Sequence, residues 1–379
     1  MNYSFAALNF LFVFSFFSLF VEFPKFGLEN EMAYAPFIVL VFYISSMLGW
    51  LFCLKKERRE VMYEIELSSL VTAILIILMI SSVYFSIKTS VEMPIFDALH
   101  KVARGEYGGI VSRVYYELPS SSGGSSGVYK LLSFIPIAIL NVISLVKLVS
   151  YDIESNKTKI SFLFSLAMIT SLIKVLFTLD RISVVFIMMA LLSYYKVSFK
   201  DFFKLKCVLA IVFFILVLNV VSSSRLADKN IFDFLFLYGR SGLENLELLT
   251  QSHIYTYGSQ TLFTSTLFVV DRLFDLSLDS TLVPYVWNPA QSIYGHAYLD
   301  FGLFGVVFFF FFGFVSRFIE SNRANYKICT VIYIPMIVSV VSGVGVIWFR
   351  GIEFIFVVML SYFIFRKIVN VKRKVFIYD

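Results

Sequence analysis

Long apolar runs are the feature of this 379-residue chain that most restricts its fold. About ten runs (nine to twelve, depending on where each is divided) carry almost no charge, and a helix needs about 20 apolar residues to cross a bilayer. Within lipid, a single segment satisfies its own backbone hydrogen bonds only as a helix. The runs that we expect to span a membrane are residues 4–21, 33–53, 67–86, 129–150, 159–178, 182–197, 207–223, 298–316, 328–348 and 351–367.

The composition agrees with a chain that lies largely in lipid. Hydrophobic residues make up 59% of it and charged residues 15%, whereas soluble domains average about 45–50% and about 25%. We therefore predict an all-α polytopic membrane protein in which residues 1–379 form a single integral membrane domain.

The distribution of basic residues predicts the orientation of the spans. Short segments such as 55–59, 196–206 and 366–374 are basic, as segments that stay in the cytoplasm usually are. Both termini are therefore expected in the cytoplasm of a bacterial cell, with the first span retained in a multi-pass protein of the inner membrane. The net charge of +6 does not indicate nucleic-acid binding, because no nucleic-acid-binding motif accompanies it.

Two long segments are expected on the outer, periplasmic face, at residues 87–128 and 224–297. The first contains a short amphipathic stretch at residues 94–104. In the second, Ser241 and Glu244 match a capping box, which predicts a short helix that begins there and runs to Leu249.

Motifs for nucleotide and metal chemistry are not found in the sequence. It contains neither a phosphate-binding P-loop nor a His-Glu-x-x-His or Cys/His metal motif. We therefore expect no cofactor and no metal. A reaction catalysed by this chain would take place at the outer face, on a substrate that arrives already activated.

Arginines on the outer segments are the first candidate site. Guanidinium groups bind phosphate oxygens in pairs and stay charged when partly desolvated, so converging arginines would suit a pyrophosphate at headgroup level. Each could instead bind an ordinary lipid phosphate or a carboxylate, and Glu353 is one helical turn from the last of them. The five are Arg181, Arg225, Arg240, Arg272 and Arg350.

The second candidate site is the polar stretch that leads into the span at 298–316. Asp300 is placed at the outer mouth of that span, and His296 precedes it by four residues, which is the same face of a helix. The pair could act as a general base toward a hydroxyl. Alternatively, Asp300 caps a helix or pairs with an arginine, and His296 is merely interfacial. Gly302 and Gly305 would allow another backbone to approach closely.

Two lysines lie within predicted spans. Lys174 and Lys147 are expected to extend their ammonium groups to the membrane surface.

Three stretches resemble the bacterial O-antigen polymerases, which are also called oligosaccharide repeat-unit polymerases. An arginine opens a span after a short outer turn in Asp180-Arg181-Ile-Ser-Val-Val-Phe. A long outer loop with Tyr238-Gly-Arg-Ser-Gly-Leu-Glu-Asn245 precedes the last three spans. The loop closes with Asn288, then Tyr294-Gly, then Tyr298-Leu-Asp300-Phe-Gly302-Leu-Phe-Gly305.

This resemblance implies a membrane-embedded glycosyltransferase that needs neither metal nor nucleotide. Its substrates would be undecaprenyl-pyrophosphate-linked oligosaccharide repeat units, joined at the periplasmic face beside a flippase, a chain-length regulator and a ligase. Asp300, His296 and Arg272 would be catalytic. The substrate-binding residues would be Arg181, Arg240, Arg225, Arg350, Asn288, Tyr294 and Tyr298.

Three other functions remain open on the sequence. An O-antigen ligase shares the many-span layout and the large outer loop. A flippase or transporter would need polar groups near mid-membrane, where the spans here are almost wholly apolar. A scaffold without enzymatic activity would not need the outer arginines.

Overall fold

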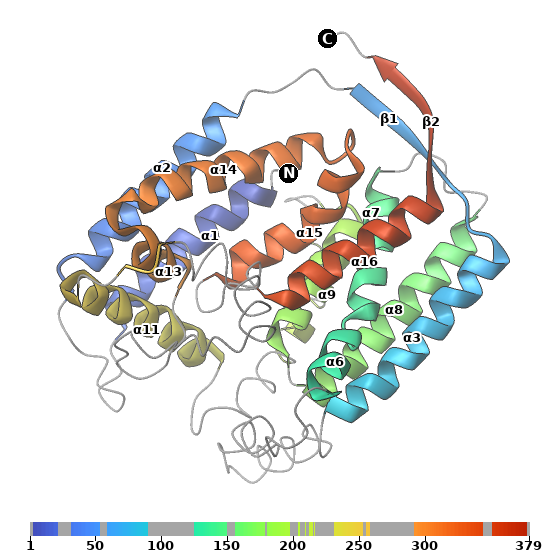
Figure 1. Cartoon of the computed structure of the whole chain (residues 1–379), viewed down its shortest axis with the longest axis horizontal. Helices are drawn as coiled ribbons and strands as arrows, with labels where there is room; N and C mark the ends of the chain where they lie inside the picture. Colours follow the sequence, from blue (N-terminus) through green and yellow to red (C-terminus); the bar gives the residue numbers. More distant parts are fainter. Residues whose placement is uncertain are drawn as a thin grey trace.

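The protein is described here by a computed structural model, which is predominantly helical (Figure 1). Within the part of the chain that the structure describes, six helical stretches are long and apolar enough to cross a membrane, and two shorter apolar helices accompany them. The described residues are 3–21, 32–53, 59–89, 125–149, 156–178, 180–197, 204, 209, 212–214, 216, 231–252, 255–257, 292–343 and 351–376. Most of the predicted span 207–223 and most of both long outer segments lie outside them.

The helices form two groups that share one central helix, α15 (Lys327–Ser342) (Figure 1). α15 contacts α1 and α14 of the first group and α7, α9 and α16 of the second. The first group comprises α1 (Tyr3–Phe17) with its extension η1 (Ser18–Phe20), α2 (Ala35–Phe52), α11 (Ile231–Ser252), α13 (Ile293–Phe301), η6 (Gly302–Phe304) and α14 (Gly305–Asn322). The second comprises α3 (Ser69–Thr89), α6 (Ser125–Leu132), α7 (Ile135–Val149), α8 (Lys157–Thr178), α9 (Arg181–Tyr194) and α16 (Ile352–Ile368).

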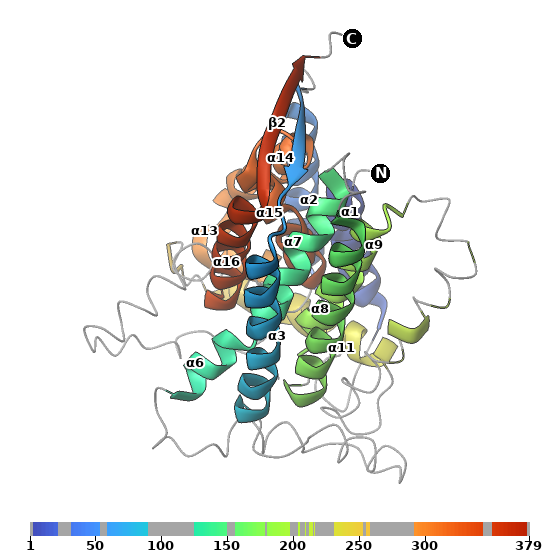
Figure 2. The same ribbon diagram turned by 90° about the vertical axis from the view of Figure 1, so that its right-hand side faces the viewer.

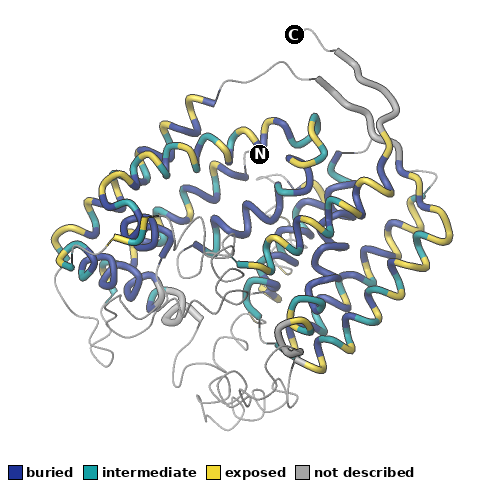
Figure 3. The backbone as a smooth tube through the Cα atoms, viewed as in Figure 1, coloured by how far each residue is buried: buried dark blue, intermediate teal, exposed yellow. Residues whose placement is uncertain are grey.

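Burial differs among the helices in the way that a membrane bundle requires. Of the most apolar 18 residues within Val128–Val149, a stretch that contains α7, 83% are buried, against 22% of the corresponding 18 residues within Ser69–Lys88 of α3. Exposed residues follow the outward faces of α2, α3 and α14 (Figure 3), and many of them are large and apolar. Such faces suit contact with lipid chains, because a membrane-spanning surface has no water to face.

α2 and α14 cross closely because each supplies a glycine at the crossing. A Cβ added at Gly49 would lie 1.8 Å from the Phe310 carbonyl oxygen, and one at Gly313 would lie 1.8 Å from the Ser46 carbonyl oxygen. The Ser45 hydroxyl adds a hydrogen bond of 2.6 Å to the Val306 carbonyl. Small residues that let two backbones meet are the usual contacts between membrane helices.

A proline in α15 explains a buried amide in α7. Pro335 has no N–H, so the Val331 carbonyl lacks its usual helical donor. The Asn141 amide donates to that carbonyl at 2.9 Å and also to the Ser361 hydroxyl of α16 at 3.1 Å. One side chain thus satisfies the backbone of α15 and ties three helices together.

A two-stranded antiparallel sheet was not predicted. β1 (Arg59–Ile65) pairs with β2 (Val369–Phe376), with Ile65 opposite Val369 and an irregularity between Met62 and Tyr63. The sheet extends beyond the ends of the helices (Figure 2). The all-α expectation therefore holds for the apolar helices and is incomplete for these basic segments, which form strands.

The N-terminal end of α1 and the C-terminal end of α16 lie at the same end of the bundle. Ser4 donates through its hydroxyl to the Glu320 carboxylate near the end of α14, and Lys327 at the start of α15 donates to the Val369 carbonyl at 2.8 Å. We call this the sheet end, because β1 and β2 lie there.

Candidate functional site

The candidate site begins with α13, a short helix at the end of the bundle opposite to the sheet end (Figure 1). The Ser292 hydroxyl caps it by accepting from the Gly295 N–H at 3.3 Å. The Ile293 N–H donates to the Gly343 carbonyl, just after α15, at 2.8 Å, which fixes the start of α13 against the central helix.

His296 and Asp300 both lie within α13, as the four-residue spacing predicted. His296 is 6% exposed and Asp300 is 1% exposed. Four residues apart on one helix, the two side chains occupy the same face. The structure thus places an imidazole and a carboxyl group on one face of α13, both nearly closed to solvent.

The predicted span 298–316 is interrupted where it was expected to be continuous. α13 ends at Phe301 and α14 begins at Gly305, with Gly302 at a φ of 55° between them. That backbone conformation favours glycine. The Tyr255 ring occupies the space beside Gly302, 2.8 Å from where a Cβ would lie. The expected close approach at Gly302 and at Gly305 is therefore made by aromatic rings, here Tyr255 and Phe42, and not by another backbone.

Thr256 is a site residue that the sequence did not reveal. Its hydroxyl donates to the Asp300 carboxylate, and its backbone N–H donates to the Leu299 carbonyl at 2.9 Å. Forty-four positions separate Thr256 from Asp300, so no local pattern could have paired them.

The two tyrosines of α13 pack against its surroundings. Tyr294 is 1% exposed, and its ring stacks on Phe309 of α14 at 5.2 Å between centroids. Tyr298 is also buried and shares a hydrogen bond with Tyr255. Tyr294 therefore packs α13 against α14, and its role as a substrate-binding residue stays a prediction.

Arg240 lies on α11, which packs against α13. α11 begins at Ile231, so Ser241 and Glu244 lie inside the helix, and the capping box predicted there is wrong. Glu244 instead pairs with Arg240 at 2.9 Å, and Arg240 also donates to the Leu19 carbonyl at the end of α1 at 2.7 Å. These contacts make Arg240 an anchor between α11 and α1.

Glu247, one turn further along α11, caps a different helix. Its carboxylate accepts from the backbone N–H groups of Tyr34 and Ala35 at 2.9 Å and 2.7 Å, at the start of α2. A carboxylate at a helix N-terminus is favoured by the helix dipole. The partners are more than 200 positions apart, so no local sequence pattern could have predicted this contact.

Arg181 opens α9 in the second group, on the other side of α15 (Figure 1). The tight turn predicted at Asp180 and Arg181 is confirmed, since α8 ends at Thr178 and Asp180 caps α9. Lys174, expected to reach the membrane surface, is instead 1% exposed, and its ammonium lies 2.6 Å from the Asp180 carboxylate. Lys174 is buried because the α8–α9 turn folds the Asp180 carboxylate back over α8.

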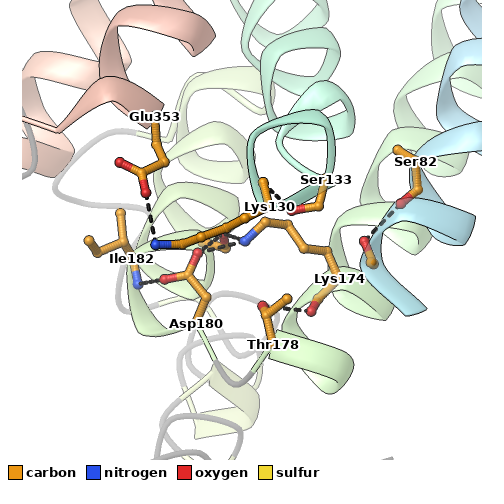
Figure 4. Close-up of polar contacts among 10 residues, drawn as sticks. Ser82, Lys130, Ser133, Lys174, Thr178, Asp180, Ile182 and Glu353 are labelled. Carbon is orange, nitrogen blue, oxygen red and sulfur yellow. Dashed lines mark hydrogen bonds and ion pairs between the residues drawn. The ribbon is translucent and has the colours of Figure 1, made fainter. Parts of the chain in front are cut away.

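A second ion pair lies beside this turn (Figure 4). The Lys130 ammonium of α6 is 2.9 Å from the Glu353 carboxylate of α16. Glu353 thus pairs with Lys130, a partner that its position one turn after Arg350 did not suggest. Four expected site residues lie outside the described part of the chain: Arg225, Arg272, Asn288 and Arg350.

An apolar groove of about 640 Å³ runs along α14 from the interruption. Its lining is almost entirely hydrocarbon and begins at Phe301, the residue after Asp300. The described lining residues are Phe301, Phe304, Val307, Phe308, Phe311, Phe312 and Val315. A lipid chain could lie in this groove with its polar end near α13.

Comparison with known proteins adds no further assignment: no family model, curated protein or solved structure matches the chain.

Proposed function

We propose that this protein is a membrane-embedded glycosyltransferase that polymerises undecaprenyl-pyrophosphate-linked oligosaccharide repeat units at the periplasmic face of the inner membrane. The product would be O-antigen or a related surface polysaccharide. The observation that carries the proposal is the buried pair His296 and Asp300 on one face of α13, at an interruption near one end of a membrane-spanning helix.

In the proposed reaction, a hydroxyl of the incoming unit attacks the anomeric carbon of the growing chain. The bond from that carbon to the pyrophosphate oxygen breaks, and the lipid pyrophosphate leaves. Asp300, or His296 oriented by it, takes the hydroxyl proton, a step that typically contributes about 10²–10⁴-fold to a rate. Arg181 and, from outside the described residues, Arg272 would neutralise the leaving pyrophosphate.

One feature of the bundle supports a lipid-linked substrate. The groove along α14 begins beside Asp300, so a chain lying in it would deliver its polar end to α13. Arg240 is the weakest of the proposed phosphate ligands, because its guanidinium already binds Glu244 and Leu19.

A flippase or transporter is the second candidate, and the interrupted helix favours it, because transporters often bind substrate where a helix is broken. The position of the break argues for surface chemistry. α14 alone has 18 residues, which is about 27 Å at ~1.5 Å per residue and nearly the thickness of the hydrocarbon core. The break therefore lies near the membrane edge and not at the midplane. An O-antigen ligase would share this geometry.

The test is the surface polysaccharide of a deletion strain of the native host carrying either the wild-type gene or the Asp300→Asn variant. We expect the variant to lose the polymer ladder while a band of core plus one unit remains. Glu247→Gln is the matched control. It alters a buried carboxylate on the neighbouring helix α11, and the role of that carboxylate is to cap α2. Loss of every repeat unit would indicate a flippase or ligase, and an unchanged ladder in the deletion strain would overturn the proposal.

A further inference from the structure

Among the described residues, a lysine buried beneath the α8–α9 turn makes its polar contacts within one small cluster (Figure 4). The Lys174 ammonium is 2.6 Å from the Asp180 carboxylate, 2.9 Å from the Ser183 hydroxyl and 3.8 Å from the centre of the Phe134 ring. Burial of a lysine is costly unless the charge is paired and hydrogen-bonded. These three contacts meet that requirement.

Asp180 connects this lysine to the start of α9. One carboxylate oxygen accepts from Lys174 and, at 2.6 Å, from the Ser183 hydroxyl, while the other accepts from the Ile182 N–H at 3.0 Å. Burial alone would raise the pKa of Asp180, but the Lys174 charge and the hydrogen bonds from Lys174 and Ser183 outweigh it and hold that pKa below its usual value. The carboxylate therefore stays ionised at neutral pH.

The geometry of the cluster fixes the backbone on both sides of Arg181. Asp180 precedes it, and the capped N–H of Ile182 follows it, so the direction in which the arginine side chain leaves the turn is set by this cap. A cation in the first turn of a helix is opposed by the helix dipole. The helix dipole therefore does not account for an arginine at this position.

We propose that Lys174 is a positioning residue that acts through Asp180 to hold Arg181 toward the pyrophosphate of the lipid-linked substrate. The proposal rests on the polymerase function proposed above and adds to it a residue with no access to the substrate. The pair of Lys130 and Glu353 lies beside the same turn and is more exposed, with 52% of the Lys130 side chain accessible (Figure 4).

The test is a double-mutant cycle in membranes supplied with purified undecaprenyl-pyrophosphate-linked repeat unit. Arg181→Ala sets the floor of activity. Lys174→Met should lower kcat/KM by about 100-fold, the cost of a small misplacement of a binding group, and Lys174→Arg should restore most of it. In the Arg181→Ala background, Lys174→Met should have no further effect, because the residue through which it acts is gone.

Two controls separate positioning from folding. If Lys174→Met alone does not fold, Lys174→Met/Asp180→Asn removes both charges of the pair and leaves no unpaired charge beneath the turn. Lys147→Met removes a lysine of α7 that lies over the Tyr194 ring, and it should leave kcat/KM unchanged.

The outcomes distinguish this inference from the proposed function. Equal losses from Lys174→Met in both backgrounds, or wild-type kcat/KM in a folded Lys174→Met protein, would overturn the positioning role alone. Absence of polymer formation by the wild-type protein would overturn the polymerase function, and the positioning role would fall with it.

Discussion

At the scale of single residues, buried polar side chains in this protein serve backbone groups that would otherwise lack partners. Glu247 satisfies the first N–H groups of α2, Asn141 satisfies the carbonyl freed by Pro335, and Asp180 satisfies an N–H of α9. In lipid, an unsatisfied backbone group costs more than it does in water, since no solvent can replace the partner. These polar residues are therefore part of the fold and not signs of a conduction path.

The pairing of Asn141 with the carbonyl freed by Pro335 can be tested by removing each side of it. Asn141→Leu should lower the free energy of unfolding in detergent by about 1–2 kcal/mol, because the Val331 carbonyl loses its donor. In a Pro335→Ala background the restored helical N–H should serve that carbonyl, so the same substitution should cost less. Equal costs in both backgrounds, measured by thermal or chemical unfolding, would show that the hydrogen bond to Val331 is not what Asn141 contributes.

How far single residues could be predicted depended on where their partners lie in the sequence. The sequence identified His296 and Asp300 as a candidate pair because they are four residues apart. It identified Asp180 because this residue belongs to a tight turn before a span. Lys174 was misjudged because its burial depends on how that turn folds back. Glu320, which accepts from Ser4 and from Tyr333, was missed because one partner is 316 positions away.

At the scale of elements, glycine decides how the helices of the first group meet. Gly49 and Gly313 let α2 and α14 cross with their backbones in contact, and Gly302 lets the chain change direction between α13 and α14. The apolar runs predicted most of the helices correctly. They could not show these crossings or the interruption, because both depend on which surfaces meet.

The crossing of α2 and α14 should not tolerate a side chain at its centre. Gly313→Ala places a methyl group in the position occupied by the Ser46 carbonyl, and overpacking of this kind typically costs about 1–3 kcal/mol. We expect a lower unfolding temperature in detergent and less protein in the membrane. Val315→Leu, which also adds carbon to α14 but on its exposed face, should behave like the wild type. Normal stability of Gly313→Ala would mean that the two helices are further apart than described.

At the scale of the whole molecule, α15 joins two groups of helices whose proposed functional residues lie on its opposite sides. Asp300 and His296 belong to the first group, and Arg181 belongs to the second. A mechanism that uses all three therefore depends on α15 holding the groups in register. The sequence predicted the apolar helices but not this division, because long-range packing leaves no periodic signal.

The orientation of the bundle is testable with two single-cysteine reporters in a chain whose native cysteines are replaced. Tyr257, which is 84% exposed, follows the residue that binds Asp300, and Tyr326 lies between α14 and α15 at the sheet end. A membrane-impermeant maleimide should label Tyr257→Cys in intact spheroplasts and Tyr326→Cys only after permeabilisation. The reverse pattern would place the candidate site in the cytoplasm and contradict the proposed periplasmic reaction.

The pairing of β1 with β2 also orders the biogenesis of the protein. β1 ends at Ile65 and β2 begins at Val369, so the ribosome releases the first strand more than three hundred residues before its partner exists. Domains generally form in the order in which they are synthesised, but this sheet can close only after the intervening helices have entered the bilayer. Until then β1 is an unpaired edge, the kind of surface that other chains add to. Closure of the sheet is thus a late event that reports completed insertion, and a chain arrested before β2 would expose β1 to chaperones and proteases.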